Sequence, residues 1–235
     1  MPIGLIGLDA DDTLWHSETI FRLTHERFGA LLADFADADT IEAKLAEVEH
    51  RNLALYGYGA KGFTLSMLET ALEISNQQAP THVIAEIVAA GREMMAHPVD
   101  PLPGVRDALE TLAQTARLIL ITKGDLFHQE QKLAASGLGS LFHGVEIVSE
   151  KTADTYARAF ARHGGRAEDA VMAGNSVRSD ILPALAAGAH AALIPYPLVW
   201  AHEAAEAPAD HPRYKELARL SDLPGWLDEL RGNTR

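Results

Sequence analysis

The chain begins with a short apolar segment, residues 3–8, that runs directly into three aspartates, Asp9, Asp11 and Asp12. A continuously apolar run of this length is typical of a parallel strand that is covered on both faces. Because side chains alternate along an extended chain, Asp9 and Asp11 are expected to point the same way from the strand's end. Two carboxylates held that close repel each other unless one is protonated or a cation joins them. The alternative is a polar strand end at which Asp12 and Thr13 only begin a turn.

The segment that follows the aspartates, residues 16–98, shows helical periodicity and no convincing strand. Its apolar residues recur at helical spacing in four separate stripes, which predicts four helices. The stripes lie within residues 20–32, 41–55, 65–74 and 83–95. Three prolines among residues 98–103 predict a linker at the end of this helical unit.

Beyond residue 104 the predicted helices and strands alternate, which favours βαβ units and a parallel sheet. Helices are expected at residues 104–114, 127–136, 152–162 and 178–187, strands at residues 118–122, 145–148, 170–174 and 189–194, a loop at residues 201–212 and one or two closing helices at residues 215–230. An isolated strand is not stable, so residues 3–8 must join this sheet. The sequence therefore predicts an α/β fold with a parallel-sheet core, residues 1–15 and 99–235, into which the four-helix unit of residues 16–98 is inserted.

The balance of charges limits the partners that this chain can bind. Its 235 residues include 33 acidic and 20 basic side chains, which gives a net charge of −13. So acidic a surface disfavours nucleic acid and anionic membranes, but a small anionic substrate can bind where the site carries a cation. Residues 181–200 lack Asp, Glu, Lys and Arg, yet Pro183, Pro195 and Pro197 interrupt them, so no membrane span is expected.

The chain contains no cysteine, which excludes disulfides, thiolate metal sites and cysteine nucleophiles. That composition suits a reducing cytoplasm. No basic segment precedes the first apolar run, so we expect no signal peptide and a cytoplasmic location.

Polar residues follow four of the predicted strands, at the sheet edge where open parallel sheets bind their ligands. They are Asp9 and Asp11, then Thr122, Lys123 and Gly124, then Lys151, and finally Asn175 and Asp180. Each residue type has a role in phosphoryl transfer. One carboxylate can attack phosphorus, and a second can protonate the leaving oxygen and later deprotonate water. A hydroxyl and a loop amide can hold a phosphoryl oxygen, a lysine supplies positive charge, and Mg²⁺ takes oxygen ligands.

This order of motifs resembles that of the haloacid dehalogenase-like (HAD) hydrolase superfamily, and the helical unit resembles its C1-type cap. Asp9 to Thr13 resemble the first motif, Thr122 the second, Lys151 the third, and Gly174 to Asp180 the fourth. The resemblance implies a Rossmann-like core, Mg²⁺ as cofactor, and hydrolysis of a small phosphorylated metabolite through an aspartyl-phosphate intermediate. It implies Asp9 as the nucleophile, Asp11 as the general acid and base, and a phosphoryl group in contact with Thr122 and Lys151. The expected metal ligands are Asp9, Asp11, Asn175 and Asp180, and the expected substrate-binding residues are Thr122, Lys123, Gly124, Lys151 and Lys61.

One position departs from the family's commonest pattern. Asn175 stands where that pattern has an acid, and its amide oxygen can still ligate Mg²⁺ but carries no charge. Asp180 can compensate for the missing charge, either directly or through a water molecule.

Two other functions stay open. The dehalogenases of this superfamily use the same first aspartate to displace halide from carbon and need no metal. In them the residue two positions after the nucleophile is not an acid, so Asp11 favours a phosphatase, while Asn175 slightly favours a dehalogenase. A non-catalytic binding scaffold is the other alternative, and the intact pair of Asp9 and Asp11 argues against it.

Residues 56–63 place three glycines and two tyrosines between two predicted helices. They form either a plain connection or a specificity loop in which Lys61 faces an anionic substrate. An exposed face of the helical unit is the expected contact surface if two copies form a homodimer.

Overall fold

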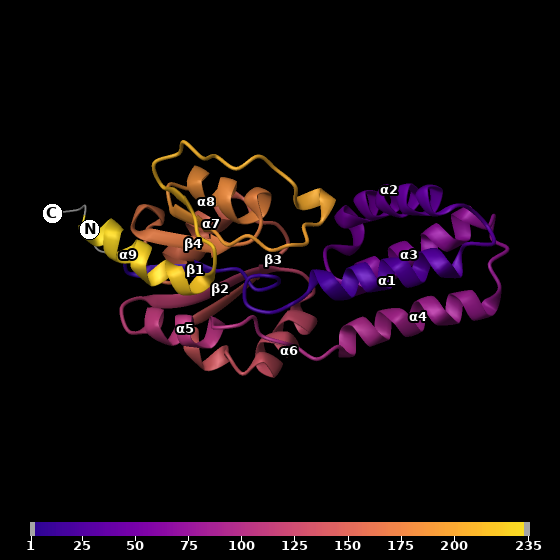
Figure 1. The fold of residues 1–235 in the computed structure, drawn as a ribbon, viewed down its shortest axis with the longest axis horizontal. Helices are drawn as coiled ribbons and strands as arrows, with labels where there is room; N and C mark the ends of the chain where they lie inside the picture. Colours follow the sequence, from indigo (N-terminus) through magenta and orange to yellow (C-terminus); the bar gives the residue numbers. More distant parts are fainter. Residues whose placement is uncertain (1–2, 233–235) are drawn as a thin grey trace. The chain divides into compact units, whose positions relative to one another are not determined.

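Figure 1 shows the computed structural model of the chain, which describes residues 3–232. The chain divides into two compact units. The first unit comprises the residues up to Glu18, Val99–Lys123 and the residues from Gln129 onward, and the second comprises Thr19–Pro98 and Gly124–His128. The short segment Gly124–His128 therefore groups with the helical unit, although it directly follows a strand of the sheet.

The first unit is built on a six-stranded parallel sheet with the strand order β3-β2-β1-β4-β5-β6. Its strands are β1 (Leu5–Leu8), β2 (Arg117–Lys123), β3 (Gly144–Val148), β4 (Ala170–Gly174), β5 (His190–Leu193) and β6 (Tyr214–Glu216). β1 pairs with β2 on one side and with β4 on the other, so that Leu8 lies opposite Leu120 and Ala173. The carboxyl ends of these three strands therefore meet at one edge of the sheet, directly before Asp9.

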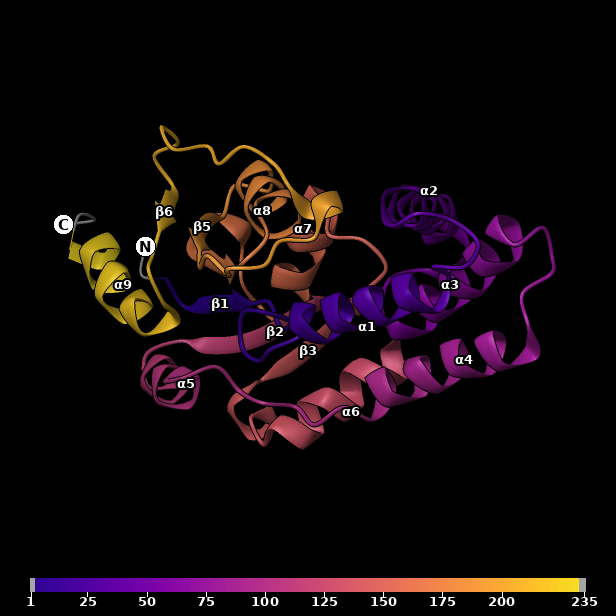
Figure 2. The ribbon, with the colours of Figure 1, turned by 45° about the vertical axis from the view of Figure 1, so that its right-hand side comes forward.

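Helices cover both faces of this sheet (Figure 2). They are α5 (Val105–Ala113), α6 (Leu126–Ser136), α7 (Ala153–Arg162), α8 (Leu182–Ala186) and α9 (Leu223–Gly232), with 3-10 turns at Gly139–Leu141, Ala167–Asp169, Ala201–Glu203 and Leu220–Asp222. One apolar cluster packs α5 and α9 against Ile6 and Leu8, and a second packs α7 and α8 against Leu5 on the opposite face. The predicted α/β fold is confirmed, and burial on both faces explains why the strands are continuously apolar.

Gly7 shows how closely a helix approaches the central strand. A Cβ atom at Gly7 would lie 3.0 Å from the Ile121 side chain and 3.2 Å from the ring of Phe160 on α7. A larger residue in β1 would therefore push α7 away from the sheet.

Two predicted elements differ in the structure. The helix expected at residues 178–187 is a π-helical turn, Val177–Ile181, followed by the short helix α8. The closing helical region begins instead with strand β6, which pairs with β5 at the edge of the sheet. With only three residues, two of them exposed, β6 is too short for a periodic sequence signal.

The second unit contains four helices, α1 (Glu18–Leu31), α2 (Ala38–Tyr56), α3 (Ala60–Ile74) and α4 (Thr81–Ala96). Their apolar stripes form one buried cluster that includes Phe28, Leu45, Met67 and Ile87. Across residues 3–232, no helix combines the length and the apolar character needed to cross a membrane.

Candidate active site

Asp12 turns the chain sharply after β1. It has a left-handed backbone with φ of 61°, and its carboxylate accepts hydrogen bonds from the amides of Ser17 (2.8 Å) and Glu18 (3.0 Å) at the start of α1. Burial raises the pKa of Asp12 to about 7 against the lowering effect of these amides. Asp12 therefore shapes the loop, and the other two aspartates face the site.

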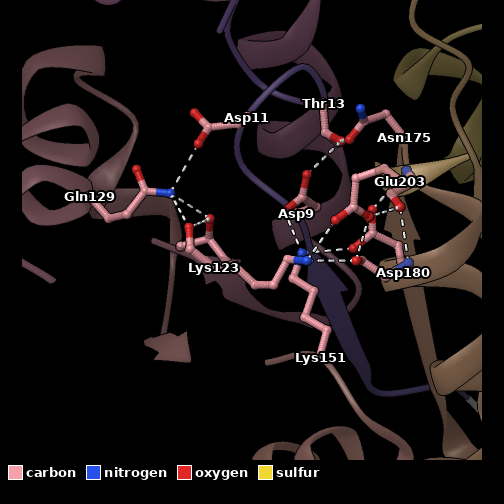
Figure 3. Close-up of polar contacts among 12 residues, drawn as sticks. Asp9, Asp11, Thr13, Lys123, Gln129, Lys151, Asn175, Asp180 and Glu203 are labelled. Carbon is pink, nitrogen blue, oxygen red and sulfur yellow. Dashed lines mark hydrogen bonds and ion pairs between the residues drawn. The ribbon is translucent and has the colours of Figure 1, made fainter. Parts of the chain in front are cut away.

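Asp9 lies in a buried group with Lys151 and Asp180. The Lys151 ammonium donates to Asp9 Oδ1 at 2.5 Å and to Asp180 Oδ1 at 2.7 Å, and the three side chains are 2%, 9% and 1% exposed for Lys151, Asp9 and Asp180 respectively. Asp180 Oδ2 also accepts from the Ser176 amide at 2.9 Å. Figure 3 shows Lys151 directed between the two carboxylates.

One ammonium serves two carboxylates in this group, and the pKa values reflect that imbalance. Burial and the charge of Asp180 raise the pKa of Asp9 to about 7, although Lys151 lowers it. Burial alone would lower the pKa of Lys151, but Asp180 and Asp9 outweigh burial and raise it. Lys151 therefore stays charged and fixes the orientation of Asp9.

Asp11 has a separate set of partners. Its carboxylate accepts from Lys132 at 2.5 and 2.8 Å, from Trp15 Nε1 at 2.7 Å and from Gln129 Nε2 at 3.0 Å. Gln129 and Lys132 lie three positions apart on α6, so both reach the same carboxylate. Burial opposes ionisation of Asp11, but Lys132, Trp15 and Gln129 together hold its pKa below the ordinary value.

Gln129 also connects Asp11 to Thr122 at the end of β2. Its amide nitrogen lies 2.7 Å from Thr122 Oγ1 and 2.7 Å from the main-chain oxygen of Lys123. Thr122 is buried, and its hydroxyl also donates to the Lys123 oxygen at 3.3 Å. The structure thus brings the predicted residues Asp11 and Thr122 together through Gln129.

Two lysines predicted to bind substrate have carboxylate partners. Lys123 donates to Glu203 at 2.7 Å and to Ser179 Oγ at 2.8 Å. Lys61, in the second unit, donates to Asp125 at 2.9 Å and lies 5.7 Å from the ring centre of Phe127.

The sequence profile of the haloacid dehalogenase-like hydrolases matches residues 3–188. The chain belongs to this hydrolase family. A haloacid dehalogenase-like family hydrolase from Xanthomonas campestris is 43% identical, with 99% of this chain and 95% of that chain covered and a TM-score of 0.88. The resemblance seen in the sequence is confirmed at the level of the superfamily. No curated protein matched the chain.

Two less similar HAD structures share the fold. HAD-hydrolase YfnB from Bacillus subtilis, solved bound to magnesium, is 17% identical, covers 97% of this chain and 100% of its own, and has a TM-score of 0.66. A 2-haloacid dehalogenase from Pseudomonas syringae pv. tomato is 22% identical, covers 97% of this chain and 99% of its own, and has a TM-score of 0.62. These neighbours include a dehalogenase, so the likeness leaves the choice between phosphomonoester and haloacid open.

The surroundings of Asn175 show whether the residues of this site suit the Mg²⁺ that HAD membership implies. One end of the Asn175 amide lies 3.1 Å from Asp9 Oδ2, 3.1 Å from the main-chain oxygen of Asp11 and 3.2 Å from Thr13 Oγ1. If the amide oxygen occupies this end, it lies next to a carboxylate oxygen and a main-chain oxygen, and all three are of the oxygen type that Mg²⁺ takes as ligands. If the amide nitrogen occupies it, the nitrogen donates to the same oxygens. The residues therefore fit Mg²⁺ when the amide oxygen occupies this end, and they satisfy one another without a cation when the nitrogen does.

The oxygens beside the Asn175 amide differ from the expected ligands in that Asp11 contributes its main-chain oxygen and Asp180 is not among them. Within residues 3–232, no three His, Asp or Glu side chains converge to hold a metal, so the main-chain oxygen of Asp11 and the amide of Asn175 are needed beside Asp9. Both oxygens of Asp180 already accept from Lys151 and Ser176, so Asp180 fixes Lys151 and the loop after β4.

The sequence did not point to Gln129, Lys132 or Glu203. Gln129 and Lys132 carry a weak signal, since polar residues three apart on a helix that follows a motif strand can face the site. Glu203 lies in a segment expected to be a loop, and no periodicity marks it.

Proposed function

We propose that this HAD-like hydrolase is a Mg²⁺-dependent phosphatase that hydrolyses a small phosphomonoester through an aspartyl-phosphate at Asp9. The observation that supports this most is that Asp9 Oδ2 and the main-chain oxygen of Asp11 each lie 3.1 Å from the same end of the Asn175 amide. When bound there, Mg²⁺ would offset the negative charge of the carboxylates and of the phosphoryl group.

An added cation matters because the lysines of this site are already paired. Lys151 contacts Asp9 and Asp180, Lys132 contacts Asp11, and Lys123 contacts Glu203. The site's carboxylates outnumber these lysines, so an anionic substrate would meet net negative charge without a metal.

The proposed reaction has two steps, transfer of the phosphoryl group to Asp9 and its hydrolysis by water. In the first, an Asp9 oxygen bonds to phosphorus, the ester P–O bond breaks, and the leaving oxygen takes a proton from the protonated form of Asp11, which the contacts with Lys132 and Gln129 make the minor form. In the second, Asp11 takes a proton from water, which attacks the same phosphorus and releases Asp9. Lys151 and Thr13 hold Asp9 in place, with Thr13 Oγ1 3.2 Å from Asp9 Oδ2. Thr122 and Lys151 are the proposed contacts of the phosphoryl group.

A metal-independent 2-haloacid dehalogenase is the second candidate. The observation that favours it is the other orientation of Asn175, in which the amide nitrogen donates to Asp9 Oδ2 and to the Asp11 oxygen. In that orientation the amide N–H groups, in place of a cation, bind the oxygens of Asp9 and Asp11. The carboxylate of a haloacid would then need a cationic partner, and the lysines described above are paired already.

The deciding experiment measures phosphate release from a panel of phosphomonoesters and chloride release from 2-chloropropionate, each with Mg²⁺ or with EDTA. We expect phosphate release that requires Mg²⁺ and no chloride release. Asp9→Asn should abolish turnover without lowering the melting temperature by more than a few degrees, and the exposed control Asp210→Asn should retain full activity. Chloride release in EDTA would establish the dehalogenase instead. No turnover, together with no binding of Mg²⁺ or orthovanadate, would establish the scaffold.

A further inference from the structure

Residues 194–213 connect β5 to β6 within the first unit. They form a long loop that contains one 3-10 turn, Ala201–Glu203, and no other helix or strand. Because β5 and β6 are parallel, this segment must carry the chain back from the carboxyl end of one strand to the amino end of the next. Figure 2 shows it as the yellow-orange loop that passes α8 before it enters β6. The segment therefore starts at the edge of the sheet that bears the candidate site.

Glu203 is the residue of this segment whose carboxylate accepts from three side chains near the candidate site. Its Oε1 accepts from Lys123 at 2.7 Å, and its Oε2 accepts from Ser176 Oγ and Ser179 Oγ, both at 2.5 Å. The Glu203 side chain is 15% exposed and that of Lys123 is 11% exposed. Hydrogen bonds to a charged group are stronger than neutral ones, and a largely buried carboxylate with three donors is held firmly (Figure 3).

The partners of Glu203 adjoin the candidate catalytic residues. Lys123 directly follows Thr122 at the end of β2, and Ser176 directly follows Asn175. The Ser176 amide donates to Asp180 Oδ2 at 2.9 Å, and Ser176 Oγ accepts from the Ser179 amide at 2.9 Å. Glu203 thus contacts the residues next to Thr122 and Asn175, and one of them, Ser176, also bonds to Asp180.

The sheet alone does not join these loops. β2 and β4 are not neighbours, because β1 lies between them in the strand order. Asp9 follows β1, so the loops after β2 and β4 lie on either side of it. Lys123 at the end of β2 already bonds to Ser179 after β4, and Glu203 bonds to both of these residues and to Ser176, so it reinforces the link between the two sides of the site around Asp9.

Two further contacts hold the segment in place. Tyr196 Oη lies 2.6 Å from His16 Nδ1 in the loop after β1, and Arg178 donates to the main-chain oxygen of His202 at 2.7 Å. These anchors mean that the segment can stay attached if Glu203 is changed. A loss of function in a Glu203 variant can therefore be separated from a loss of the whole segment.

We infer that Glu203 is a positioning residue, which holds Lys123, Ser176 and Ser179 so that the end of β2 and the loop after β4 keep their places around Asp9. The inference rests on the proposed function of this site. Lys123 then acts as a link between Thr122 and Glu203, and not as a substrate ligand. Glu203 contacts no reacting atom in this arrangement.

The test compares Glu203→Ala and Glu203→Gln with Glu206→Ala, an exposed glutamate of the same segment that serves as the matched control. With the phosphomonoester and Mg²⁺ that give the highest activity, we expect Glu203→Ala to lower kcat at least tenfold with a smaller change in KM. Glu203→Gln keeps one acceptor oxygen but not the charge, so it should recover part of the loss. Glu206→Ala should match the unchanged protein.

Hydrogen exchange of the substrate-free proteins provides a second readout. We expect faster exchange in residues 122–124 and 175–181 of Glu203→Ala, as well as in residues 201–204. Faster exchange confined to residues 194–213, with unchanged kcat, would overturn the inference, because Glu203 would then hold down only its own segment. If Glu203→Ala does not fold, Ser179→Ala, which removes one of the three donors, should show the same pattern to a smaller degree.

The two readouts also separate this inference from the proposed function. If no variant hydrolyses any phosphomonoester, the proposed function fails, and the exchange pattern alone decides the role of Glu203. If phosphatase activity is found but Glu203→Ala and Glu206→Ala are equally active, the function stands and the positioning role is overturned.

Discussion

Lys132 donates to both carboxylate oxygens of Asp11, at 2.5 and 2.8 Å. Asp9, two residues earlier, is bound by a different lysine, Lys151, at 2.5 Å. The two carboxylates are therefore not equally neutralised, because Asp11 has Lys132 to itself whereas Asp9 shares Lys151 with Asp180. The pKa of Asp11 is accordingly held below its ordinary value, and that of Asp9 is raised to about 7 by burial and the charge of Asp180.

The pairing of Lys132 with Asp11 should appear as an energetic coupling. Lys132→Met and Asp11→Asn are each expected to lower the free energy of unfolding by about 1–3 kcal/mol, because each leaves a partly buried partner unpaired. The double variant should lose less than the sum of the two single losses. Urea denaturation of the four proteins measures the coupling. The exposed pair of Lys215 and Glu229, 3.8 Å apart, is the control and should show coupling below about 0.5 kcal/mol. Additive losses at Lys132 and Asp11 would contradict the pairing.

Asn175→Asp should alter both metal affinity and stability. The new carboxylate would lie beside Asp9 and the Asp11 main-chain oxygen, so it adds a charged ligand for Mg²⁺ and removes the amide that can donate to these oxygens. We expect Mg²⁺ affinity to rise about tenfold, which corresponds to about 1.4 kcal/mol, and the melting temperature in EDTA to fall.

Calorimetric titration with Mg²⁺ and thermal denaturation in EDTA measure the two effects of Asn175→Asp. Asn76→Asp adds the same charge at an exposed position and is the control. Unchanged affinity together with an unchanged melting temperature would show that the Asn175 amide does not face a cation site.

Asp12 contributes to stability in two separable ways. Its left-handed backbone, with φ of 61°, favours Asp, Asn or Gly, and its carboxylate accepts from the amides at the start of α1. Asp12→Ala loses both contributions and should cost about 2 kcal/mol of unfolding free energy. Asp12→Asn should cost less than half of that, and Asp12→Gly should fall between them, since it relieves the backbone but removes the acceptor. Equal losses for Ala and Asn in urea denaturation would contradict this role.

Glu203 should make stability depend on acid pH. Burial opposes its ionisation, but Lys123, Ser176 and Ser179 lower its pKa from 4.5 to about 2. Two further charged groups lie nearby, Glu150, 3.6 Å from Lys123, and Arg178, bonded to the main-chain oxygen of His202. A folded-state pKa below the unfolded value means that the stabilisation is complete above about pH 4.5 and is lost as the pH falls toward 2.

The comparison of the unchanged protein with Glu203→Gln isolates the stabilisation that comes from the charge of Glu203. Their difference in unfolding free energy, on the order of 3 kcal/mol at most near neutral pH, should shrink steadily between about pH 5 and about pH 3. Urea denaturation over that range measures it. A difference that stays constant with pH would show that the charge of Glu203 contributes nothing to stability.

The sheet could be predicted because its strands are buried on both faces and so read as apolar runs. The same logic placed Asp9, Lys151 and Asp180 at one edge, and the structure joins them directly. β6 could not be predicted, since a three-residue edge strand leaves no pattern. The π-helical turn after β4 was equally hidden, because it has the same spacing of apolar residues as a helix.

The partners of the site residues were harder to predict than their positions. Asp11 was expected to share a cation with Asp9, but its orientation depends on Lys132 and Gln129, which only the packing of α6 brings near. Glu203 lies 80 positions beyond Lys123 along the chain, and no local pattern links two charges at such a separation.

The most direct measurement of how Asp9 reacts is its oxygen isotope content after many turnovers in water enriched in the heavy isotope. If Asp9 carries a phosphoryl group, water attacks phosphorus, and the heavy oxygen enters the released phosphate. If Asp9 has displaced the halide and carries an ester of the 2-hydroxy acid, water attacks the carbonyl carbon of Asp9, and the heavy oxygen enters the aspartate. With a phosphomonoester and Mg²⁺, we expect mass spectrometry to find heavy oxygen in the phosphate and none in the peptide that contains Asp9. Heavy oxygen in Asp9, after turnover of 2-chloropropionate in EDTA, would contradict the phosphatase and identify a dehalogenase.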